Sequence, residues 1–90
     1  MQRLNITVHG RVQGVGFRAF VLDKAKSLGL AGFVKNMSDG TVFIDVQGDE
    51  ETLKKFLEYV NQGPSLSRVD RVDIVKVNQM LNSKDFIVTY

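Results

Sequence analysis

The change from a strand to a helix is encoded in residues 3–28, which read RLNITVHGRVQGVGFRAFVLDKAKSL. Apolar and polar residues alternate as far as His9, and this alternation is typical of a half-buried β-strand. From Phe17 the apolar residues recur at helical spacing, and Gly29 follows as a helix stop signal. The segment between them, residues 10–16, contains three glycines and predicts a loop. The strand positions that share one face are Leu4, Ile6 and Val8, and the helical positions are Phe17, Phe20, Val21, Ala25 and Leu28.

The next part of the chain predicts a β-hairpin. A short apolar run from Leu30 to Val34 leads into Lys35-Asn36 and indicates a second strand. Ser38-Asp39-Gly40 is a turn signal, in which Gly40 can adopt a positive φ angle. The alternation then resumes from Thr41 to Gln47, which predicts a third strand.

The remaining residues predict one helix and two strands. Gly48-Asp49-Glu50-Glu51 begins the helix with acidic residues, which suit the positive end of the helix dipole. Asn61-Gln62-Gly63-Pro64 ends it. A fourth strand follows with a slip in its alternation that indicates a bulge, and a fifth strand closes the chain. The helical stripe consists of Leu53, Phe56, Leu57 and Val60, the fourth strand carries Val69, Val72, Ile74 and Val77, and the fifth carries Phe86, Val88 and Tyr90.

This order of elements, βαββαβ plus a C-terminal strand, predicts an α+β fold. It is the ferredoxin-like split βαβ sandwich, in which two helices pack on one face of a mostly antiparallel sheet. The length of 90 residues suits one domain, so we expect residues 1–90 to form a single domain.

Composition excludes several classes of site and location. The chain has no cysteine and a single histidine, so disulfides, thiol nucleophiles and Cys- or His-cluster metal sites are excluded. No apolar run approaches the roughly 20 residues of a membrane span, and residues 1–5 lack the apolar core of a signal peptide. We therefore expect a cytoplasmic protein with no membrane partner.

Charge is concentrated in the first part of the chain. Twelve Lys and Arg residues against ten Asp and Glu residues give a net charge of +2, which is too small to indicate nucleic acid binding. Residues 1–36 contain several basic residues but only one acidic residue, Asp23. An anionic small ligand and a solvated basic face both remain open as explanations. These basic residues are Arg3, Arg11, Arg18, Lys24, Lys26 and Lys35.

The glycine-rich loop before the first helix is a candidate anion site. Successive backbone N–H groups can converge in such a loop, and the helix that follows adds its positive end. Arg18, in the first helical turn, presents a guanidinium fork that matches phosphate oxygens. The loop lacks the Gly-Lys-Ser/Thr end of a P-loop, and the chain is too short for a dinucleotide-binding fold. A tight connection with no ligand is the alternative.

Two signature motifs and one further segment carry a resemblance to a known family. Residues Val8 to Arg18, VHGRVQGVGFR, are similar to the signature loop of the acylphosphatase family. Gly32-Phe33-Val34-Lys35-Asn36 followed by Asp39-Gly40-Thr41-Val42 resembles its second signature. Residues 63–70, GPSLSRVD, are similar to the segment before the fourth strand of bacterial members. The resemblance therefore spans nearly the whole chain.

This resemblance implies an enzyme that hydrolyses the carboxyl–phosphate anhydride of acyl phosphates to a carboxylate and inorganic phosphate. It implies no metal and no cofactor. Arg18 would clamp the phosphate, and Asn36 would hold the attacking water. Inorganic phosphate or sulfate would compete for the site, and a monomer is expected. The implied phosphate-binding amides are those of Gln13, Gly14, Val15, Gly16, Phe17 and Arg18.

Other functions fit the residues of this sequence less well. RNA-recognition domains share it, but they need stacked aromatic residues on the sheet, and the third strand has one aromatic residue and a carboxylate. Acylphosphatase-like domains also occur at the N-terminus of hydrogenase-maturation carbamoyltransferases. Because this chain runs only from Met1 to Tyr90, we expect a free-standing enzyme. A phosphate-binding regulator is the alternative. His9, alone at a strand end, is interpreted as structural rather than as an acid–base group.

Overall fold

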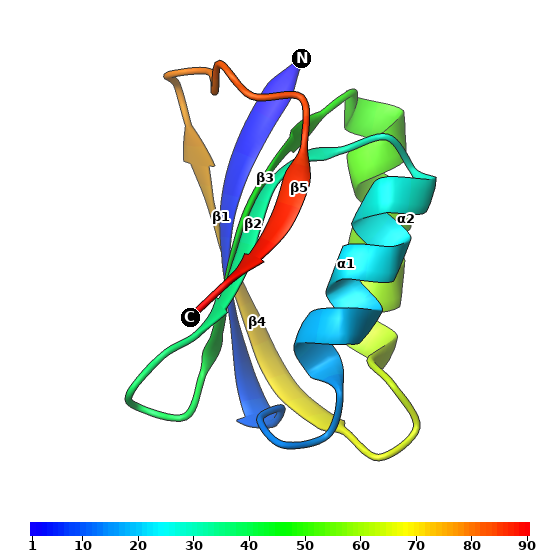
Figure 1. Cartoon of the computed structure of the whole chain (residues 1–90), viewed down its shortest axis with the longest axis vertical. Coiled ribbons are helices and arrows are strands. Elements are labelled where there is room, and N and C mark those ends of the chain that lie inside the picture. The colour runs from blue at the N-terminus through cyan, green and yellow to red at the C-terminus, as the bar shows by residue number, and fades with distance from the viewer.

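The computed structural model describes residues 1–90 and contains the predicted order of elements. Five strands form one sheet, and both helices lie on the same side of it (Figure 1). The ferredoxin-like α+β prediction is therefore confirmed. In chain order the elements are β1 (Gln2–Arg11), α1 (Phe17–Ser27), β2 (Ala31–Asn36), β3 (Val42–Gly48), α2 (Glu50–Gln62), β4 (Arg68–Val77) and β5 (Phe86–Thr89).

The strand order is β4-β1-β3-β2-β5. β1 pairs antiparallel with β3 and β4, β2 pairs antiparallel with β3, and β5 pairs parallel with β2. β2 therefore lies two strands away from β1, although α1 alone connects them in sequence. This arrangement brings the start of α1 and the ends of β2 and β5 to the same region of the molecule.

The core lies between the sheet and the helices. Leu4, Ile6 and Val8 of β1 are buried, as their alternation predicts. Phe17 of α1 and Phe56 of α2 are among the largest fully buried side chains. Burial of such side chains contributes about 1.5–3 kcal/mol each, so the two helices are held to the sheet chiefly by apolar contact. Neither helix has the length and the apolar character that a membrane span needs.

The loop prediction for residues 10–16 is wrong at its first two positions. Gly10 and Arg11 continue β1 because they pair with Val69 and Arg68 of β4. The register between the two strands shifts at this point, with His9 opposite Arg71 and Gly10 opposite Val69. One residue of β4, Asp70, is therefore extra, and the predicted bulge is confirmed. Pairing continues for two residues beyond the bulge, so the connection to α1 is shorter than the glycine pattern indicates.

Candidate functional site

A pocket of about 400 Å³ lies where the loop, the start of α1 and the ends of β2 and β5 meet. It contains both residues that the sequence singled out, Arg18 and Asn36, although 18 positions separate them in the chain. The pocket is within the size range of small-molecule sites. Its lining residues are Val12, Gly14, Gly16, Phe17, Arg18, Ala19, Leu22, Asn36, Val88 and Tyr90.

The backbone of the loop is shaped by two glycines. Gly14 and Gly16 have φ angles of 72° and 80°, in the left-handed region that other residues rarely adopt. A Cβ atom at either position would meet no atom within 4 Å. These glycines are therefore required by the path of the chain and not by a crowded neighbour.

Gly16 is also the N-cap of α1 and offers no side chain to the helix. Its carbonyl accepts the first helical hydrogen bond, from the Phe20 N–H at 3.0 Å. Among the backbone hydrogen bonds outside regular elements, none is donated by an amide of residues 13–19. The first amides of a helix have no partner within it. A run of N–H donors therefore remains unpaired beside the pocket, as an anion site requires.

Arg18 lies in the first turn of α1, where no acidic residue balances it. A cation there is disfavoured by the helix dipole, so its presence needs another explanation. Its guanidinium forms none of the ion pairs of the chain and lies over the ring of Tyr90, with 4.7 Å between the guanidinium carbon and the ring centroid. The charge is thus held against an aromatic face and stays available to an anion.

Asn36 is the last residue of β2 and is half-buried at the pocket. It pairs with Val42 of β3, and it shares the helix-facing side of the sheet with the buried Val34. Its Oδ1 atom is buried and accepts no hydrogen bond. An unpartnered acceptor beside a pocket is a place where a ligand or a bound water is expected.

Gln13 connects the loop to the β2–β3 turn. Its Nε2 atom donates to the Met37 carbonyl at 2.7 Å and to the Thr41 carbonyl at 2.9 Å. The residue does not line the pocket, so its side chain has a role that sequence reasoning missed. The two bonds hold the amides of the loop at a set position relative to Asn36. Val15, another predicted loop residue, packs against the core instead of lining the pocket.

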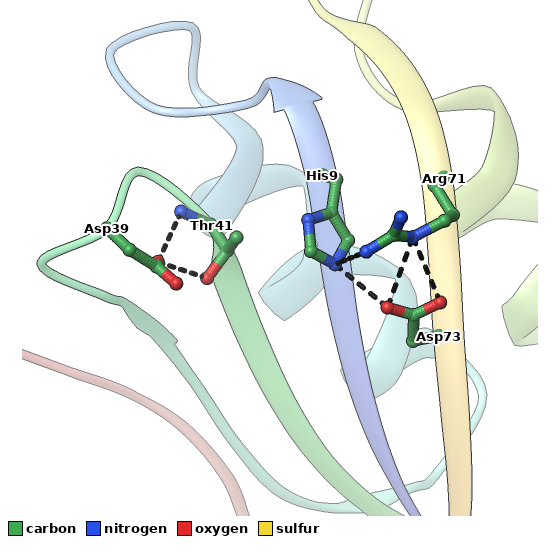
Figure 2. Close-up of polar contacts among 5 residues, drawn as sticks. All are labelled: His9, Asp39, Thr41, Arg71 and Asp73. Atoms are coloured by element: carbon green, nitrogen blue, oxygen red, sulfur yellow. Dashed lines mark hydrogen bonds and ion pairs between the residues drawn. The ribbon is translucent and has the colours of Figure 1, made fainter.

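The β2–β3 turn is itself fixed by a carboxylate. Asp39 Oδ1 accepts hydrogen bonds from the Thr41 hydroxyl at 2.7 Å and from the Thr41 N–H at 3.0 Å (Figure 2). These bonds favour the ionised form, so they lower the pKa of Asp39, with the hydroxyl bond as the largest cause. The ionised carboxylate thus supports the turn to which Gln13 is bonded.

His9 lies on the open face of the sheet, opposite to the helices. Its Nε2 atom is 2.9 Å from Asp73 Oδ2 and 3.2 Å from Arg71 Nη2 (Figure 2). The interpretation of His9 as structural agrees with this position. Lys35 lies on the same face, opposite Phe43 of β3, so it does not add charge to the pocket.

The apolar side of the pocket was not predicted as part of a site. Ala19 and Leu22 come from α1, whereas Val88 and Tyr90 come from the end of the chain. No local motif marks these four residues. They meet Arg18 because β5 pairs with β2, and this long-range pairing has no signal in the pattern of either strand.

Comparisons with known proteins agree with the fold and the motifs. The family model described as Acylphosphatase matches residues 4–88. The acylphosphatase of Thermotoga maritima is 46% identical over 90 residues, which cover 100% of this chain and 99% of the relative. The crystal structure of acylphosphatase from Bacillus subtilis superposes over the whole of both chains with a TM-score of 0.97 at 40% identity. Full-length HypF, a larger protein, matches 99% of this chain over 12% of its own length, with a TM-score of 0.91 at 37% identity. Because the family model and a full-length relative both match nearly every residue, the chain belongs to the acylphosphatase family.

Proposed function

We propose that this protein hydrolyses the carboxyl–phosphate anhydride bond of acyl phosphates in the pocket at the start of α1. The products are a carboxylate and inorganic phosphate. The observation that carries the proposal is the meeting of unpaired loop amides, an unpaired Arg18 and the unpartnered Asn36 in one pocket. Membership of the acylphosphatase family supports the same reaction.

The loop amides and Arg18 would bind the phosphoryl group. Its non-bridging oxygens carry the negative charge that must be stabilised while the bond to the acyl oxygen breaks. N–H donors held by the backbone need no reorganisation during the reaction, which makes them effective in stabilising a charged transition state. The Arg18 guanidinium adds a full positive charge with a planar set of donors.

Asn36 would place the water that attacks phosphorus. The water oxygen forms a new bond to phosphorus while the bond between phosphorus and the carboxyl oxygen breaks. No Asp, Glu or His lines the pocket, so we assign the water proton to an oxygen of the substrate phosphate. The carboxylate leaves as a stable anion and needs no proton donor. Positioning and charge stabilisation thus suffice.

The same proposal assigns no role to a metal ion. No three His, Asp or Glu side chains of the structure converge into a group that could bind one. We further propose that residues 1–90 act as one domain and as a monomer, which size-exclusion chromatography with light scattering tests. The cytoplasmic location stays a prediction.

A turnover assay in the presence of a chelator tests the function. We expect hydrolysis of benzoyl phosphate and no hydrolysis of phenyl phosphate, because a phosphate monoester has a much poorer leaving group. Activity that disappears in chelator and returns with magnesium or zinc would overturn the metal-free reaction. A protein that binds phosphate but hydrolyses no acyl phosphate would instead be a phosphate-binding regulator.

A further inference from the structure

One wall of the pocket is apolar and lies beside the polar groups that would bind phosphate. Leu22 follows Arg18 by four residues, so it lies one turn further along the same face of α1. Both residues line the pocket. Leu22 is half-buried and packs against the core, so its side chain is held in place.

The end of the chain completes this wall. Val88 pairs with Val34 of β2 and shares its helix-facing side, whereas Ile87 faces the other side and is 53% exposed. Tyr90 is 90% exposed, yet it lines the pocket and lies against Arg18. Its ring therefore offers an aromatic surface to a ligand at no cost in core packing.

We propose that Leu22, Val88 and Tyr90 form a subsite for the acyl group and that the protein prefers acyl phosphates with an apolar, flat acyl group. This inference rests on the proposed function. A phosphate bound at the loop would place the acyl group of its anhydride in the remaining space of the pocket. The only charged side chain in the lining is Arg18, which the phosphate occupies. An acyl group with a second charge would find no charged side chain to pair with, whereas an apolar acyl group would gain free energy by leaving water for contact with Leu22, Val88 and the Tyr90 ring.

Two pairs of ligands test the preference. We would measure kcat/KM for benzoyl phosphate and acetyl phosphate, and the Kd of phenylphosphonate and methylphosphonate, which bind without reacting. Contacts with an apolar pocket of this kind change discrimination by about 10-fold or more. We therefore expect at least a 10-fold preference for the phenyl compound in both pairs.

Variants test which residues cause the preference for the phenyl compounds. Tyr90→Ala removes the exposed ring without disturbing the core, and we expect it to reduce the preference several-fold, whereas Tyr90→Phe keeps the ring and the preference. Val88→Thr keeps the shape of the side chain and makes the wall more polar, which should reduce the preference as well. Ile87→Ala is the matched control on the opposite face of β5, and it should leave the preference unchanged.

The outcomes separate this inference from the function on which it rests. Equal kcat/KM values and equal Kd values for both members of each pair would overturn the acyl subsite and leave the hydrolase function intact. A preference that Tyr90→Ala and Val88→Thr do not change would also overturn it. Failure to hydrolyse either acyl phosphate would overturn the function, and the phosphonate affinities would still decide whether the apolar subsite exists.

Discussion

Removal of the Gln13 side-chain amide is expected to weaken both folding and catalysis. Gln13→Met keeps the length of the side chain but loses the bonds to the Met37 and Thr41 carbonyls. Each such bond contributes a net 0.5–1.5 kcal/mol or so. Both carbonyls retain a second donor, since the Gly40 N–H bonds to Met37 and the Met37 N–H bonds to Thr41. No acceptor is left unpaired, and we expect the free energy of unfolding to fall by about 1–3 kcal/mol.

The variant should stay folded and still lose catalytic activity. Gln13 connects the loop that we propose binds phosphate to the turn after Asn36, so we expect its removal to let the two halves of the proposed site move apart. A displacement of about 1 Å can reduce a rate by about 100-fold. We expect kcat for benzoyl phosphate to fall between about 10- and 100-fold, with a folded protein in urea titration and circular dichroism.

Gln62→Met is the matched control. Gln62 is an exposed residue at the end of α2, so the same substitution there should change neither kcat nor stability. A folded Gln13→Met protein with the kcat of the wild type would show that these hydrogen bonds do not position the site.

Three further predictions follow from the same site. Arg18→Ala should raise KM and lower kcat together. It should also abolish most of the rise in Tm that inorganic phosphate gives the wild type by mass action, as measured by differential scanning fluorimetry. A full phosphate effect in the variant would show that the anion binds elsewhere. Asn36→Ala should lower kcat by about 100-fold or more while phosphate inhibition is nearly unchanged. Its free energy of unfolding in urea should change by no more than about 1 kcal/mol, because Oδ1 accepts no hydrogen bond. A near-normal kcat would show that Asn36 has only a structural role at the turn. The lowered pKa of Asp39 means that its contribution to stability is present above the pKa of the unfolded chain and is lost as pH falls through the folded value. Thr41→Val removes the hydroxyl donor, so an NMR titration should show the pKa of Asp39 moving back toward its ordinary value, and an unchanged pKa would contradict the assigned cause.

Secondary structure was largely predictable because its signals are local. The alternation in β1 and the helical stripes in α1 and α2 place Leu4, Ile6, Phe17 and Phe56 in the core, as observed. Each of these patterns depends on residues within two turns or a few strand positions of one another. The end of β1 was predicted too early because its pairing with β4 beyond His9 is not a local property.

The same distinction between local and long-range signals applies to the residues of the site. Gly14, Gly16 and Arg18 are neighbours in the chain, so the geometry of one loop and one helix start was enough to indicate an anion site. Asn36 followed only from the family resemblance, since nothing in its own surroundings points to water or phosphate. Its place in the same pocket as Arg18 depends on the strand order, in which β3 separates β1 from β2.

Which side chains come together in the apolar wall and on the open face of the sheet depends entirely on long-range contacts. The alternation places Tyr90 in the fifth strand, but β5 ends at Thr89, and Tyr90 reaches Arg18 because β5 pairs parallel with β2. The sequence indicates one aromatic residue on the third strand, and the sheet adds Phe33 from β2, with ring centroids 5.8 Å apart between Phe33 and Phe43. Local periodicity specifies which face of an element a side chain occupies. Which other side chains it then meets is set by the packing of elements distant in sequence, whose free energy is summed over the whole core.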